Sequence, residues 1–139
     1  MNIILSIKPK WAKLIYEGKK TIEWRKSFPK AENIDKVLLY ETAPVKAITG
    51  FFTLQEIPFY LVSSVCAQPE QIIKNGCVPM VDLIKYRANV DCIYGWMIDK
   101  VTKFEEPLPL SYVDLKRPPQ SWCYDCLNAS TGLDPIPNI

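Results

Sequence analysis

One short run near the start of the chain brings several ionisable side chains close together. Residues 18–26 read GKKTIEWRK and combine a glycine turn, lysines, a carboxylate and an arginine. If this run is a strand, Glu23 and Arg25 project from one face, about 6–7 Å apart at the backbone. The pair could grip a phosphate or a base edge, because arginine offers a planar fork of donors and glutamate accepts from an amino group. An exposed salt bridge beside a hairpin is the alternative interpretation.

Histidine is absent from the chain, and this absence removes several catalytic mechanisms. The protein has no Ser-His-Asp triad, no Cys-His pair and no HExxH zinc site. Any general acid or base must therefore be a glutamate, an aspartate, a lysine, a tyrosine or a cysteine.

The five cysteines predict neither a disulfide framework nor a regular metal site. An odd number of them in a chain without an export signal favours reduced thiols. Cys123 and Cys126 form a lone CxxC, and a four-thiolate zinc site would need two more ligands, such as Cys66 and Cys77, at an unusual spacing. We therefore expect no metal and no cofactor, and incidental or buried thiols, Cys92 among them, in preference to a zinc or redox site.

The composition indicates one soluble domain with an uneven distribution of charge. Of 139 residues, 48% are hydrophobic and 23% charged, and no apolar run approaches the ~20 residues that span a bilayer. The first nine residues are too strand-like for a signal peptide, so we expect a cytoplasmic protein without a membrane partner. Residues 1–46 carry 10 basic against 5 acidic side chains, whereas residues 47–139 carry 7 against 10. An anionic partner would be attracted to the basic first third, although a solvated basic face explains it equally well.

The patterning predicts one early helix followed by several strands. Pro9 opens a helix that ends near Gly18, a residue suited to a left-handed C-cap. The strand at 21–26 alternates, so Trp24 should lie on a buried face and Glu23 on a wet one. Gly50 interrupts another strand and marks a bulge or a close backbone approach. The other predicted elements are strands at Asn2–Ile7, Lys36–Glu41, Ala47–Ile57 and Cys92–Phe104, and short helices at Pro69–Asn75 and Pro79–Arg87.

This order of elements favours an α+β fold. Mostly antiparallel strands would form a small closed or half-closed β-barrel, with short helices packed at its ends. A doubly wound parallel sheet is disfavoured, because the strands at 21–26, 36–41 and 47–57 lack helical crossovers. Residues 1–126 are expected to form the domain, and the polar, proline-bearing residues 127–139 a loosely ordered tail.

Several blocks of the sequence resemble the ASCH domain family. The signature of that family is a glycine, any residue, a lysine, two variable residues, a glutamate, any residue and an arginine. Gly18, Lys20, Glu23 and Arg25 meet it. The other resembling blocks are ILSIKPKWA at 4–12, YETAPVK at 40–46, ITGFF at 48–52 and RPPQSW at 117–122. The resemblance therefore covers nearly the whole predicted domain.

The resemblance implies a PUA-like β-barrel that binds RNA or a nucleotide-like small molecule in a cleft beside the first helix. In that family the signature motif lines the cleft. The resemblance therefore places Lys20, Glu23 and Arg25 in the cleft, with Gly18 as the turn that lets the backbone approach.

Residues outside the motif are candidates for the same cleft. Amide and hydroxyl groups read bases, which suggests Gln120 and Ser121, and the Trp11 indole is a stacking platform if it is not part of the core. Lys8 and Lys10 could contact phosphates, although solvated lysines are the simpler interpretation.

An enzyme is the alternative that the resemblance leaves open. One group of relatives removes the acetyl group of N4-acetylcytidine with a threonine and a lysine of this motif and a distant glutamate. Lys20 matches that lysine, but Glu23 stands in the place of the threonine and Thr21 is two residues away. Other relatives are similar to a ribonuclease that acts on single-stranded RNA. In an enzyme, Lys20 and Glu23 would be the catalytic pair, and Glu41 could add a second carboxylate.

Overall fold

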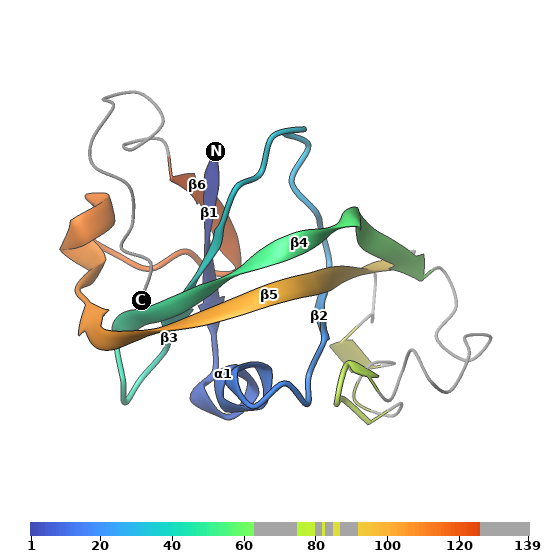
Figure 1. Cartoon of the computed structure of the whole chain (residues 1–139), viewed down its shortest axis with the longest axis horizontal. Coiled ribbons are helices and arrows are strands. Elements are labelled where there is room, and N and C mark those ends of the chain that lie inside the picture. Colours follow the sequence, from blue (N-terminus) through green and yellow to red (C-terminus); the bar gives the residue numbers. More distant parts are fainter. Residues whose placement is uncertain (63–74, 80–81, 83–84, 87–91, 126–139) are drawn as a thin grey trace.

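The computed structural model describes residues 1–62, 75–79, 82, 85–86 and 92–125 of the chain. Strands dominate these residues, and one short helix packs against them (Figure 1). In chain order the elements are β1 (Asn2–Ile7), α1 (Pro9–Tyr16), β2 (Ile22–Arg25), β3 (Val37–Glu41), β4 (Ala47–Val62), β5 (Ile93–Leu108), the 3₁₀ helix η2 (Leu110–Val113) and β6 (Trp122–Asp125).

The described strands form one sheet in the order β2-β5-β4-β3-β1-β6. Neighbouring strands are antiparallel except β1 and β3, which run parallel with Ile3 opposite Val37. The sheet curves into a half-barrel, and α1 lies at the end of β1 (Figure 1). The predicted α+β class and the half-closed, mostly antiparallel barrel are therefore confirmed. The predicted helices at 69–75 and 79–87 and the tail at 127–139 lie largely or wholly outside the described residues.

Two strands are longer than their alternation predicted. β4 and β5 span 16 residues each and pair with one another along most of their length. The predicted strand ended at Ile57, before Pro58, because proline has no N–H to donate to a ladder. In the structure the pairing shifts register between Leu54 and Phe59, and this irregularity lets β4 continue past the proline.

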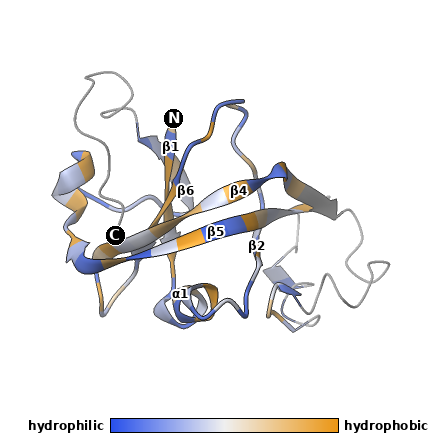
Figure 2. Cartoon of the chain, in the orientation of Figure 1, coloured by the Kyte–Doolittle hydropathy of each residue, from blue (hydrophilic) through white to orange (hydrophobic). Residues whose placement is uncertain are grey.

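Helix α1 begins and ends as its sequence predicted. Pro9 stands in its first turn, and Gly18 follows its end with a φ of 77°. Ala12 and Ile15 are buried whereas Lys13 is exposed, so hydrophobic and hydrophilic residues share the helix (Figure 2). Among the described residues, no helix combines the length and the apolar character that crossing a membrane requires.

Two buried clusters cover the two faces of the sheet. The first contains Leu5 and Trp96 together with Ala12 of α1. The second contains Ile4 and Leu38 on the opposite face. Since adjacent residues of a strand point to opposite faces, β1 is buried on both sides and its sequence is a nearly continuous apolar run. Because β1 is packed on both faces, the residues at its end have fixed positions.

Side chains join the two edges of the sheet near β2 and β6, where the strands themselves are not paired. The indole of Trp122 donates to the Ser27 hydroxyl at 2.9 Å, and that of Trp96 donates to the Ser27 carbonyl at 3.0 Å. The Tyr124 hydroxyl accepts from the backbone N–H groups of residues 30 and 31. We refer to these contacts of Ser27, Trp122 and Tyr124 as the β2–β6 junction, and the candidate site lies beside it.

Gly50 has the close backbone approach that the sequence predicted. The β4–β5 pairing shifts register between Ile48 and Gly50. A Cβ atom at Gly50 would overlap the Thr102 carbonyl oxygen and would lie 2.7 Å from the Tyr16 hydroxyl. The absence of a side chain here therefore allows β5 and α1 to approach β4.

We predict that Gly50→Ala lowers the free energy of unfolding by about 1–3 kcal/mol, the usual cost of overpacking a closed interior. Gly18→Ala is the matched comparison, because nothing lies within 4 Å of its Cβ position and only its positive φ opposes a side chain. Its cost should be about 1 kcal/mol. Chemical denaturation of both variants measures the difference, and a larger loss for Gly18→Ala would contradict this account.

Candidate functional site

A cavity of about 470 Å³ opens where β1, the start of α1, β2 and residues 78, 82 and 86 meet. Its lining combines cationic, aromatic and hydrogen-bonding side chains with two carboxylates. The lining residues are Ser6, Lys8, Lys10, Trp11, Glu23, Trp24, Arg25, Thr42, Val78, Asp82, Tyr86 and Gln120. Three of them are basic and two acidic, so the lining has a small excess of positive charge.

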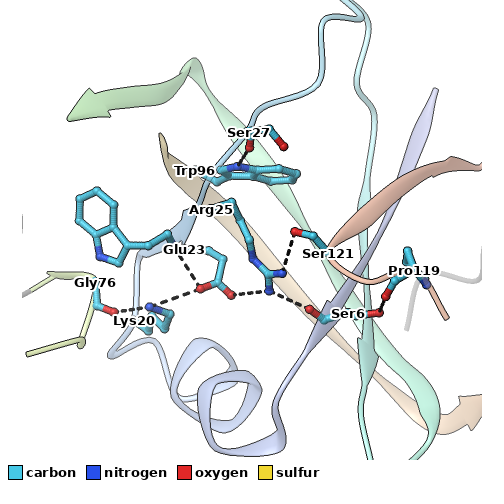
Figure 3. Close-up of polar contacts among 10 residues, drawn as sticks. Ser6, Lys20, Glu23, Arg25, Ser27, Gly76, Trp96, Pro119 and Ser121 are labelled. Atoms are coloured by element: carbon cyan, nitrogen blue, oxygen red, sulfur yellow. Dashed lines mark hydrogen bonds and ion pairs between the residues drawn. The ribbon is translucent and has the colours of Figure 1, made fainter. Parts of the chain in front are cut away.

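Three hydrogen bonds fix the guanidinium of Arg25 beside the cavity. Its Nη2 donates to the Ser6 carbonyl at 2.7 Å and to Glu23 Oε2 at 3.3 Å, and its Nη1 donates to the Ser121 hydroxyl at 3.2 Å (Figure 3). The hydroxyl of Ser6 in turn donates to the Pro119 carbonyl at 2.6 Å. A guanidinium has five N–H groups, so two remain without a partner among the described residues.

Glu23 lies between two cations and is 4% exposed. Its Oε1 is 3.6 Å from the Lys20 Nζ and accepts from the Trp24 backbone N–H at 3.2 Å, while its Oε2 binds Arg25. The prediction that the Glu23 side of this strand is wet is therefore wrong. The reason is that ion pairs with the buried Lys20 and with Arg25 hold the Glu23 carboxylate in the interior, so both faces of β2 are buried.

Lys20 is buried completely, with no exposed side-chain surface. Its Nζ donates to the Gly76 carbonyl, pairs with Glu23 and lies 5.3 Å from the centre of the Trp11 ring. Burial lowers the pKa of Lys20 below its usual range, and the Glu23 carboxylate opposes that shift. A buried ammonium is tolerated here because a carboxylate, a carbonyl and an aromatic face surround it.

Gly76 is a residue beside the site that sequence reasoning missed. Its carbonyl is the acceptor for Lys20, and a Cβ atom at Gly76 would overlap the Trp24 indole nitrogen. That nitrogen is buried, and none of the residues that the structure describes forms a hydrogen bond with it. The backbone N–H of Thr21 also donates to the Asn75 carbonyl at 3.0 Å. No local pattern could have revealed these contacts, because about 55 residues separate the partners in sequence.

The structure brings most of the predicted cleft residues to the cavity and separates others from it. Lys8, Trp11 and Gln120 line the cavity together with the predicted motif residues Glu23 and Arg25. These five residues therefore lie around one cavity. That they bind a ligand there stays a prediction.

The remaining candidates stand behind the cavity or away from it. Ser121 uses its hydroxyl as an acceptor for Arg25, and Lys20 lies behind Glu23. Gly18 is in the turn after α1 and does not line the cavity. Glu41 is buried at the end of β3, and its neighbour Thr42 lines the cavity in its place.

The described residues contain no group of three or more cysteine, aspartate or glutamate side chains placed to hold a metal ion. Cys77 donates through its thiol to the Lys19 carbonyl at 3.3 Å, and Cys92 is half-buried. Cys66 and Cys126, the other partners of the zinc site considered above, lie outside the described residues.

A model of a known domain family, described as the ASCH domain, matches residues 5–108 of the chain. A Zymomonas mobilis protein named ASCH domain-containing ribonuclease is 39% identical over 54 residues, which are 39% of this chain and 36% of that protein. The large ribosomal subunit protein uL22 of Ureaplasma parvum serovar 3 is 24% identical over 124 residues, 88% of this chain and 39% of that protein. The matched parts thus span well under half the length of both curated relatives.

Solved structures resemble the fold as well. The crystal structure of ASCH from Zymomonas mobilis matches with a TM-score of 0.75 at 22% identity and covers 88% of this chain and 86% of that chain. A serine-to-alanine variant of the same protein matches with a TM-score of 0.76 at 21% identity and covers 88% and 87%. At these identities the likeness shows the arrangement of the strands and the helix.

We predict that Lys20 makes stability depend on pH in the alkaline range. Its pKa is lowered in the folded chain and is ordinary, 10.5, in the unfolded chain. Between those two values the unfolded chain binds more protons, so the free energy of unfolding rises with pH. Lys20→Met should remove that rise, whereas Lys100→Met, at an exposed position on β5, should keep it.

Chemical denaturation at a series of pH values below 10 measures this difference. The series stops there because burial also raises the pKa of Tyr16, which reverses the trend at higher pH. Parallel curves for the wild type and Lys20→Met would contradict the prediction.

Proposed function

Because the chain belongs to the ASCH domain family, as its motif predicted, we propose that it binds single-stranded RNA and takes one nucleotide, or a nucleotide-like small molecule, into the cavity. One relative is named a ribonuclease and another a ribosomal protein, and both names concern RNA. The family and these names favour an RNA-related role, and the geometry of the cavity suggests how the chain would perform it.

The observation that carries the proposal is the anchoring of Arg25. Three hydrogen bonds to Ser6, Glu23 and Ser121 hold its guanidinium beside the cavity, and two N–H groups are left over. A fixed guanidinium loses little conformational freedom when it binds a phosphate or a carbonyl group. Its side chain is 13% exposed, so water competes weakly for those donors.

The rest of the cavity suits the parts of one nucleotide. Lys8 and Lys10 are exposed cations at its rim and would contact backbone phosphates. Trp11 is half-buried and lines the cavity, where its ring would stack on a base. The volume of about 470 Å³ lies in the range that holds one small molecule and is too small for a stacked duplex.

Lys20 and Glu23 support the site from behind in this proposal. Both are buried, and Glu23 has both oxygens occupied by Lys20, Trp24 and Arg25. We therefore assign them the role of positioning residues, which hold the guanidinium and the residue 75–79 segment in place.

Cleavage of the bound RNA is a second candidate function, favoured by the name of the Zymomonas mobilis relative. Negative charge develops on the non-bridging phosphate oxygens in phosphodiester cleavage, and the Arg25 guanidinium would stabilise it. Deacetylation of a modified cytidine is less favoured. The two oxygens of Glu23 are occupied, and Thr21, the threonine of the motif region that is nearest to Glu23 in sequence, is exposed and does not line the cavity.

We predict salt-sensitive binding of a labelled single-stranded RNA in fluorescence anisotropy titrations. The double variant Lys8→Gln/Lys10→Gln should flatten the slope of log affinity against log salt by about 1.4, or about 0.7 for each lost phosphate contact on a single strand. Lys100→Gln removes the same kind of charge from β5, outside the cavity lining, and should bind with nearly the wild-type slope. The proposal fails if the wild-type chain shows no affinity even at low salt.

We predict that Arg25→Gln slows any RNA cleavage at least about 100-fold, the usual cost of removing a donor that stabilises transition-state charge. Gel analysis of end-labelled single-stranded RNA measures the rate. Lys100→Gln, purified in the same way, should cleave like the wild type and controls for contaminating nuclease. Equal cleavage by all three proteins would reject the enzymatic function, and a melting curve for Arg25→Gln would show whether it is folded.

A further inference from the structure

We propose that Asp82 selects the base in the cavity by accepting a hydrogen bond from an exocyclic amino group, so that cytosine is preferred over uracil. The inference rests on the proposed function, because it assumes that the cavity receives a nucleotide. It adds a specificity determinant that lies outside the motif.

Of the carboxylates that line the cavity, that of Asp82 is the one available to a ligand. Two carboxylates line the cavity, and both oxygens of Glu23 are already engaged. No described residue forms a hydrogen bond or an ion pair with the side chain of Asp82, which is exposed. We therefore assign to Asp82 the role that the sequence suggested for Glu23, which is to accept a hydrogen bond from an amino group.

The position of Asp82 is set by contacts that connect its segment to the motif. Its backbone N–H donates to the Pro79 carbonyl at 3.0 Å, and Gly76, three residues before that proline, accepts from Lys20. Tyr86 lies under the Lys26 ammonium, which is 5.0 Å from the ring centre. Segments on either side of Asp82 thus contact the motif and the residue that follows β2.

The charges of the cavity are separated in a way that matches a nucleotide. Lys8 and Lys10 belong to the junction of β1 and α1, whereas Asp82 and Tyr86 belong to the described pieces between residues 75 and 86, which Figure 1 draws on the other side of β2. A nucleotide carries its negative charge on the phosphate, and its base can carry donors at the opposite end. With the phosphate on the lysines, the base would lie toward Asp82 and Tyr86.

The chemistry of a carboxylate decides which base it favours. An ionised aspartate only accepts hydrogen bonds, so it pairs with the amino group of cytosine and is repelled by the carbonyl oxygen that uracil has at the same position. Asparagine has both an acceptor and a donor, so Asp82→Asn would remove the repulsion and offer uracil a donor. The substitution should therefore change the preference between bases more than the overall affinity.

The test compares heptamers of cytidine and of uridine in anisotropy titrations at pH 7.5. The wild-type chain should bind oligocytidine about tenfold more tightly than oligouridine, the discrimination expected of one good base contact. In Asp82→Asn the ratio should fall to about one or invert. Asp99→Asn makes the same change of charge at an exposed position on β5 outside the cavity lining and should keep the wild-type ratio.

The outcomes separate this inference from the function on which it rests. Salt-sensitive binding of both heptamers with equal affinity, or a ratio that Asp82→Asn and Asp99→Asn alter alike, would overturn the role of Asp82 and leave RNA binding intact. Failure of both heptamers and of a mixed-sequence RNA to bind would overturn the proposed function and the inference with it.

Discussion

The site depends on one buried carboxylate that two cations share. Glu23 pairs with Lys20 on one side and with Arg25 on the other, and each of those cations reaches a backbone carbonyl of another segment, Gly76 or Ser6. A buried charge that loses its partner is strongly destabilising, so the three side chains are tolerated only as a set. These three side chains connect residues 75–79 to the end of β1, and they fix the orientation of the Arg25 guanidinium at the cavity.

Around Lys20, Glu23 and Arg25, apolar packing and polar contacts have different roles. The apolar clusters on the two faces of the sheet hold β1 in place, and β1 supplies the Ser6 carbonyl. Hydrogen bonds at the β2–β6 junction then bring Ser121 to Arg25, although β2 and β6 share no backbone ladder. The cavity therefore lies at the part of the half-barrel where directional contacts between side chains replace regular strand pairing.

The sequence was sufficient where the signal is local and insufficient where burial comes from a distant segment. Pro9 and Gly18 fix the ends of α1 through their own backbone preferences, and both were predicted. The burial of Glu23 was not, because alternation treats a polar residue as exposed and cannot register that Gly76, distant in sequence, binds the Lys20 ammonium that pairs with Glu23.

The resemblance implied that Arg25 lies in a cleft and the amide chemistry suggested Gln120; both residues line the cavity, and their binding of a ligand stays a prediction. The motif and its resemblance did not separate residues that face the cavity from residues that support it. Ser121, expected to read bases, instead holds Arg25. That distinction depends on which donors and acceptors are already occupied, and only three-dimensional contacts define it.

The parallel pairing of β1 with β3 and its antiparallel pairing with β6 also set the order of assembly during translation, since Ile4 pairs with Cys123. A nascent chain that has not yet released β6 from the ribosome has the motif but neither the last strand nor the Ser121 anchor. Its arginine then has the Ser6 and Glu23 partners but not the third, so the guanidinium gains its full set of hydrogen bonds only once β6 has been synthesised.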